Sequence, residues 1–169
     1  MQVVMKYSDL MPLPGAEKLV QVSFRKIGMV YDNILACGMK PYVELSFMPK
    51  HLASSDAKCA FYYGGCIAPP RDDEEWIGFI KKFVTYLIDR YGAEEVESWP
   101  FEVWNELDVF VFWAGTKEQY FHLYEITARA IKEVDDKICV GGPAASGSKW
   151  VGSFMAYCKE REIPVDFIS

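Results

Sequence analysis

Short apolar segments alternate with helical patterns along this chain, and no other feature of the sequence restricts its fold as strongly. The segments that are short, apolar and bounded by Gly, Pro or polar residues are 41–47, 99–104, 138–141 and 164–168. Each is typical of a buried strand. The segments whose apolar residues recur at helical spacing are 27–37, 72–91, 116–134 and a stretch around 149–160. This alternation predicts an α/β fold with a parallel sheet and helical crossovers, either doubly wound or closed as a (β/α)₈ TIM barrel.

The ends of the predicted helices carry recognisable signals. Gly38 stands where the C-terminus of the first helix favours a positive φ angle. Asp72 or Asp73 can cap the second helix, and residues 116–119 match a capping box before the third. Residues 50–71 contain Ser, Gly and Pro and follow no clear period, so we expect a long loop there. Long loops in compact domains are often functional.

Two observations favour the barrel over the doubly wound sheet. Residues 141–143, Gly-Gly-Pro, lack the third glycine and the helix start of a dinucleotide-binding loop. Polar residues (Ser46, Asn105 and Glu106) gather at the predicted carboxyl ends of strands, where barrel enzymes place their chemistry. A full barrel takes about 250 residues, whereas this chain has 169. We therefore expect the middle of a barrel.

The composition excludes several classes of protein. Hydrophobic residues make up 51% of the chain and aromatic residues 15%, which is too apolar for disorder and too evenly spread for a membrane span. The net charge of -6 argues against nucleic acid, whose protein partners usually present a basic face. A neutral or weakly charged ligand fits better. Aromatic rings suit sugar binding, although most of them are expected in the core.

The cysteines and histidines predict neither a disulfide framework nor a metal site. The five cysteines are widely spaced without a Cys-x-x-Cys pair, and only His51 and His122 are present to help ligate a metal. No cofactor is expected. Reduced thiols, and an N-terminus without a long apolar stretch, indicate the cytoplasm. The sequence is compatible with a homo-oligomer.

Glu106 has the surroundings of a catalytic acid in glycoside hydrolysis. That reaction needs one carboxylic acid to protonate the leaving oxygen, and a second carboxylate that attacks the anomeric carbon or activates water. An apolar, partly desolvated setting keeps such an acid protonated near neutral pH. Glu106 follows an apolar strand, and Asn105 beside it can hydrogen-bond a sugar hydroxyl. On these residues alone, a surface glutamate at a strand-to-loop junction is the alternative.

Residues 104–106, Trp-Asn-Glu, are preceded by Phe-Glu-Val and followed at 112–113 by Phe-Trp. This segment resembles the acid/base segment of glycoside hydrolase family 39, which contains β-xylosidases and α-L-iduronidases. The resemblance covers roughly residues 26–169 and leaves residues 1–25 poorly matched; its further motifs lie at 30–35, 38–41, 43–49 and 141–144. It implies a (β/α)₈ barrel, of which this chain holds about strands 3 to 6 with their helices. It also implies a retaining mechanism, with Glu106 as acid/base and Asn105 in contact with the sugar.

Two departures from the family pattern bear on the site. The family usually has Pro directly after the catalytic Glu, whereas this chain continues with Leu107 and Asp108. In the family the nucleophile is a Glu at the end of the seventh strand. Residues 167–169 resemble the sixth strand, so the nucleophile is expected beyond residue 169.

The remaining carboxylates within strands are weaker candidates for chemistry. Glu44, Glu102 and Asp166 each lie in a predicted strand. A buried charge persists only when it is paired or hydrogen-bonded. We therefore interpret all three as buried, hydrogen-bonded structural groups.

Four further residues are candidates for contact with the sugar. Phe112 and Trp113 follow Glu106 and could form an apolar platform for the leaving group, with more support from the resemblance for Phe112. Phe47 and His51 flank the mouth of the preceding strand, although His51 is also compatible with a surface loop position.

The leading hypothesis is a retaining glycosidase of β-xylosidase type, acting on short xylo-oligosaccharides and inactive as this segment alone. Another barrel glycosidase, of glucosidase or mannanase type, is the first alternative. A non-catalytic carbohydrate-binding remnant of a barrel is the second.

Overall fold

The computed structural model describes residues 23–54, 58–60 and 65–169. Parallel strands form its central sheet in the order β1 (Val43–Glu44), β4 (Phe101–Glu102) and β5 (Val140–Gly141). Phe167 adds the next segment by a parallel bridge to Gly141. The four predicted strand segments therefore lie side by side in chain order, which confirms the parallel sheet, although the segment 164–168 contributes only this bridge.

The main helices form where the apolar periodicity predicts them. They are α1 (Arg25–Ala36), α2 (Asp73–Tyr91), α4 (Lys117–Val134) and α5 (Val151–Glu160). Asp72 caps α2 by accepting the Glu75 N–H at 2.9 Å, and Thr116 with Gln119 forms the predicted capping box at α4. Each cap contributes about 1 kcal/mol to helix stability. No helix within the described ranges is both long enough and apolar enough to cross a membrane.

Three elements were not predicted from the sequence. The short helix α3 (Ala93–Glu97) follows Gly92, and an antiparallel pair, β2 (Cys59–Ala60) with β3 (Gly65–Cys66), lies within the segment predicted as a long loop. A five-residue helix and two-residue strands are too short to show a helical or alternating period. The pair is held by its ladder, and Met48 continues it by an antiparallel bridge to Cys66.

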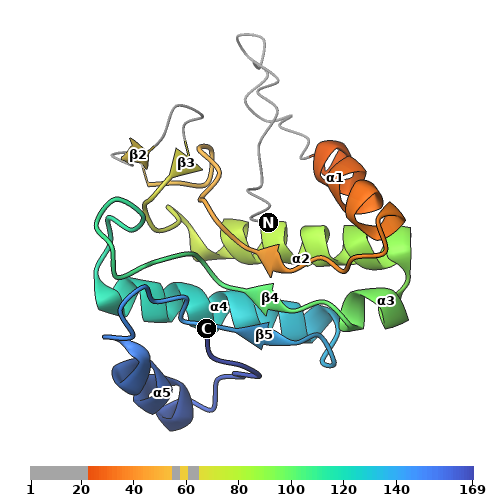
Figure 1. The fold of residues 1–169 in the computed structure, drawn as a ribbon. Coiled ribbons are helices and arrows are strands. Elements are labelled where there is room, and N and C mark those ends of the chain that lie inside the picture. Colours follow the sequence, from red (N-terminus) through yellow and green to blue (C-terminus); the bar gives the residue numbers. More distant parts are fainter. Residues whose placement is uncertain (1–22, 55–57, 61–64) are drawn as a thin grey trace, which may run out of the picture.

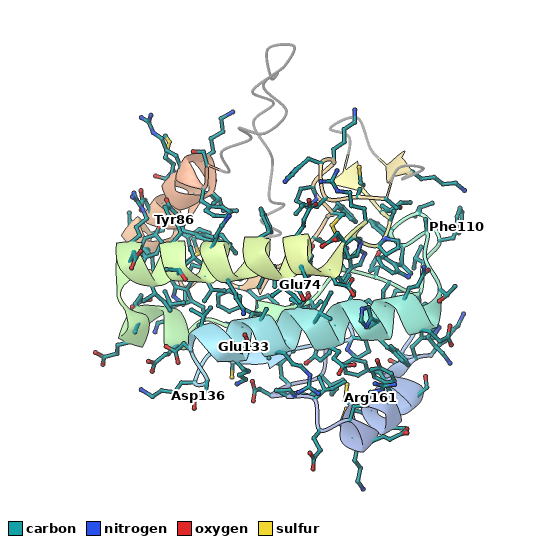
Figure 2. The ribbon with its side chains drawn as sticks, turned by 180° about the vertical axis from the view of Figure 1, so that it is seen from behind. Glu74, Tyr86, Phe110, Glu133, Asp136 and Arg161 are labelled. Atoms are coloured by element: carbon teal, nitrogen blue, oxygen red, sulfur yellow. The ribbon has the colours of Figure 1, made fainter. Side chains whose placement is uncertain are left out.

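Helices α2 and α4 lie side by side across one face of the sheet (Figures 1 and 2). Val43, Phe101 and Val140 occupy equivalent positions in the three strands and are fully buried against this layer. Inside it, the indole Nε1 of Trp76 on α2 donates to Thr127 Oγ1 on α4 at 2.8 Å. The core thus fixes the crossover helices to the strands, and through them the loops that leave the strands' carboxyl ends.

Alternate strand residues place carboxylates on the other face of the sheet. Glu44 and Glu102 are partners in the register of β1 and β4 and are only 5% and 8% exposed. Ser46 donates its hydroxyl to Glu44, and Tyr42 donates to Glu102 Oε1 at 3.1 Å. The interpretation of both as buried, hydrogen-bonded groups is therefore confirmed. In the view of Figure 1, no described helix lies across this face.

Asp166 corrects the third of these interpretations. It is hydrogen-bonded as expected, because its Oδ2 accepts the Val140 N–H and also pairs with Lys132 Nζ, both at 2.8 Å. It is exposed, however. Its segment pairs with β5 through the Asp166 N–H, which donates to the Val140 carbonyl at 2.8 Å, and through the bridge at Phe167. Within the described residues this segment forms the edge of the sheet, where solvent reaches the side chain.

Candidate functional site

Glu106 lies at the carboxyl end of β4, as the sequence predicts, and the backbone around it is unusual. The ladder continues past β4 to Val103, whose N–H donates to the Gly141 carbonyl at 3.0 Å. Trp104 and Glu106 then have φ angles of +72° and +45°. Residues other than glycine seldom adopt this left-handed region, and each one costs of order 1–3 kcal/mol. Such conformations gather at functional sites, where the surrounding structure enforces them.

Hydrogen bonds and burial hold the β4–α4 loop, residues 103–116, in this shape. The indole Nε1 of Trp104, which is fully buried, donates to the Phe112 carbonyl at 2.8 Å. The Val109 N–H donates to the Glu106 carbonyl at 2.9 Å, which closes a turn directly after the glutamate. Leu107 is also buried. Glu106 and Asn105 themselves are half-buried, so both remain partly accessible.

The predicted aromatic contacts divide into two groups. Phe112 is half-buried, and its ring stacks on Phe47 with centroids 6.1 Å apart and planes 9° from parallel. Phe47 is only 5% exposed and also meets Trp104 edge-on at 5.7 Å. Phe112 therefore remains a candidate platform for the sugar, with the buried ring of Phe47 stacked against it. The predicted sugar contact of Phe47 itself has no support from its exposure.

The prediction that Trp113 forms part of the apolar platform is wrong. Its side chain is 3% exposed, lies edge-on to Trp104 at 5.0 Å and donates its Nε1 to the Thr116 carbonyl at 2.9 Å. The ring packs in the core, because the loop turns back toward α4 directly after Phe112. The exposed aromatic residue of this loop is instead Phe110, which is 84% exposed and projects from its tip (Figure 2).

His51 lies in the segment after β1, in a turn closed by bonds from the N–H groups of Leu52 and Ala53 to the Pro49 carbonyl. It is half-buried. Burial lowers its pKa below the ordinary value and the positive charge of Arg71 lowers it further, while Glu75 opposes the shift. The charges that act on His51 thus come from the start of α2. The imidazole is neutral near pH 7 and can accept a hydrogen bond.

Asp108 is a further residue of the loop, and reasoning from the sequence did not identify its role. Its carboxylate accepts the N–H of Ser146 at 2.8 Å and of Gly147 at 3.0 Å. Both donors belong to the β5–α5 loop, residues 142–150. Nothing local in the sequence signals this contact, because the partners lie 38 and 39 residues apart.

Parallel strands with crossover helices on one face, and a half-buried glutamate held in a strained turn at a strand's carboxyl end, define a segment of a (β/α)-barrel enzyme. The model of the family described as glycosyl hydrolases family 39 matches residues 9–169, so the chain belongs to this family.

Two β-xylosidases are similar to the chain in sequence. The one from Caldicellulosiruptor saccharolyticus is 47% identical over 152 residues, which cover 89% of this chain and 31% of that protein. The one from Geobacillus stearothermophilus is 46% identical over 150 residues, which cover 87% of this chain and 30% of that protein. The chain therefore spans about a third of the length of these relatives.

A solved structure of a family 39 β-xylosidase from Caulobacter crescentus has a similar fold. It superposes with a TM-score of 0.84 at 42% identity, over 90% of this chain and 34% of the other. At this level of identity, the agreement supports both the fold and the assignment of the chain to the family.

Proposed function

We propose that this chain is part of a retaining β-xylosidase that removes xylose from short xylo-oligosaccharides. It would contribute strands 3 to 6 of the barrel and the acid/base, while the nucleophilic carboxylate comes from residues outside this segment. The observation that carries the proposal is the position of Glu106: half-buried, next to Asn105, in a left-handed turn at the carboxyl end of β4. The similarity to the two β-xylosidases supports the choice of sugar.

In the proposed mechanism Glu106 acts twice. It first donates a proton to the glycosidic oxygen while the nucleophile attacks the anomeric carbon, and it then removes a proton from the water that releases the covalent intermediate. Asn105 binds the sugar hydroxyl beside the bond that breaks. Phe112 offers an apolar face to the departing sugar, because its ring is supported by Phe47 and only partly covered.

The test uses the full-length protein and compares leaving groups. Wild-type protein should hydrolyse xylobiose and aryl β-xylosides faster than the matching β-glucosides and β-mannosides. Glu106→Gln should lower the rate on xylobiose by about 10²–10⁴-fold. On a dinitrophenyl xyloside the loss should be much smaller, because that leaving group departs without protonation. Azide, which attacks without a general base, should accelerate the variant on the aryl substrate.

Glu133→Gln is the matched control. Glu133 is an exposed carboxylate on α4 that pairs with Lys81, and Figure 2 shows it on the helical side of the molecule. Its loss should leave both rates unchanged. Equal rates for wild type and Glu106→Gln on xylobiose would show that Glu106 is not the acid. A preference for glucosides or mannosides would indicate the other type of barrel glycosidase, and binding without turnover a carbohydrate-binding remnant.

A further inference from the structure

Asp108 joins two neighbouring loops at the carboxyl edge of the sheet. Its Oδ1 accepts the Ser146 N–H at 2.8 Å and its Oδ2 accepts the Gly147 N–H at 3.0 Å, so each carboxylate oxygen has its own backbone donor. Two adjacent N–H groups that face one carboxylate form a fixed pair of charge-assisted hydrogen bonds. This contact connects the β4–α4 loop to the β5–α5 loop.

The contact lies close to Glu106 along a constrained piece of backbone. Asp108 follows Glu106 by two residues, and Leu107 between them is buried. The Val109 N–H donates to the Glu106 carbonyl at 2.9 Å, so both residues belong to one closed turn. Movement of Asp108 would therefore rotate this turn and displace the Glu106 carboxylate.

The contact also favours the charged form of Asp108. Burial raises the pKa of Asp108, but hydrogen bonds from the backbone N–H groups of Ser146, Gly147 and Asp108 itself and from the Ser146 side chain together outweigh it, so the pKa lies below the ordinary value. The backbone donors that join the two loops thus favour the ionised form of the carboxylate.

We propose that Asp108 is a positioning residue, which orients the Glu106 carboxylate toward the leaving oxygen by tying its loop to the β5–α5 loop. This inference rests on the proposed function of Glu106. Because both carboxylate oxygens of Asp108 accept backbone N–H groups, we assign it a structural and not a chemical part in the reaction. Its removal should mainly slow the step in which Glu106 donates a proton to the leaving oxygen. A displacement of a catalytic group by about 1 Å can reduce a rate roughly 10²-fold.

The experiment measures the leaving-group dependence of Asp108→Ala in the full-length protein. We expect kcat on xylobiose to fall by about 10–100-fold. The rate on a dinitrophenyl xyloside should change by less than about threefold, since this substrate needs no protonation. Asp108→Asn keeps one acceptor oxygen and places an amide against the second N–H. It should therefore also lose more rate on xylobiose than on the dinitrophenyl xyloside, but by a smaller factor than Asp108→Ala. It also serves as the test variant if Asp108→Ala fails to fold.

Asp135→Ala is the matched control for general destabilisation. Asp135 also accepts a backbone N–H, from Lys137 at 3.0 Å, but it lies after α4, ahead of β5 and away from the carboxyl edge. Its loss should lower the melting temperature, and it should change the rates on xylobiose and on the dinitrophenyl xyloside by the same factor.

The outcomes distinguish this inference from the function on which it rests. The positioning role would be overturned if Asp108→Ala and Asp108→Asn lost rate equally on both substrates or on neither. In that case Glu106→Gln would still lose much more rate on xylobiose than on the dinitrophenyl xyloside. A wild-type protein that hydrolysed no β-xyloside would overturn the proposed function, and the positioning role with it.

Discussion

The indole N–H of Trp104 donates to the carbonyl oxygen of Phe112 at 2.8 Å, and Glu106 lies on the chain between these two residues. This bond joins the two ends of the loop segment that contains Glu106, and it holds the segment against the buried ring of Trp104. Because Trp104 and Glu106 both adopt left-handed backbone conformations, the loop needs such contacts to keep its shape. The same ring contacts Phe47 and Trp113, so the loop is fixed from the core side.

Trp104→Phe should loosen this loop. The change leaves the Phe112 carbonyl without its donor, and we expect a loss of about 1–3 kcal/mol in stability. It should also lower kcat on xylobiose in the full-length protein. Thermal unfolding and steady-state kinetics measure the two effects.

Trp99→Phe is the matched control. Trp99 is also buried and donates its indole N–H to Glu95 Oε1 at 2.9 Å, but it precedes β4 instead of following it. We expect a similar loss of stability and an unchanged kcat. If the two variants lose kcat equally, the loop bond has no special relation to Glu106.

Thr127→Val should weaken the contact between α2 and α4. Valine has nearly the shape of threonine but lacks the hydroxyl that accepts the Trp76 indole N–H in the core. A buried donor left without a partner costs about 1–3 kcal/mol. Thr127→Ser, which keeps the hydroxyl, should lose less. A Thr127→Val protein as stable as wild type, by urea unfolding, would show that water or another acceptor replaces the bond.

His51 should titrate below the ordinary histidine value of about 6.5. Burial and then Arg71 lower its pKa, and Glu75 opposes them, so Arg71→Ala should raise the pKa and Glu75→Gln should lower it further. Since the folded pKa lies below the unfolded one, His51 lowers stability as the pH falls below about 6.5 toward the folded pKa. NMR titration, with the His51→Gln variant to assign the signal, measures these shifts. If the pKa of His51 is unchanged in Arg71→Ala, the charge of Arg71 does not contribute to the shift.

A polypeptide of these 169 residues alone should show no turnover of an aryl xyloside. Within the described residues, the sheet meets helices on one face, while Tyr42 is 44% exposed and Phe110 is 84% exposed. Open strand edges and exposed apolar groups favour association. We therefore also expect stronger binding of a hydrophobic dye than by the full-length protein. Turnover by the isolated segment would contradict the proposal that the nucleophile lies outside it.

The sequence predicted the elements whose signals are local. Apolar periodicity placed α2 and α4, and the capping residues Asp72 and Thr116 marked their first turns. Strand segments followed from short apolar runs, and their parallel arrangement followed from the alternation with helices. The elements that escaped prediction, α3 and the β2–β3 pair, are too short to show a period.

By itself, therefore, the sequence determined the parallel sheet and the position of Glu106 at the end of a strand, because propensity and alternation act over a few neighbouring residues. Only the tertiary structure decided that Trp113 packs in the core, that Glu44 and Glu102 stand side by side, and that Asp108 binds the next loop. These outcomes depend on side chains brought together from distant parts of the chain, for which no local pattern exists. The physical surroundings of Glu106 are a property of the packed loops.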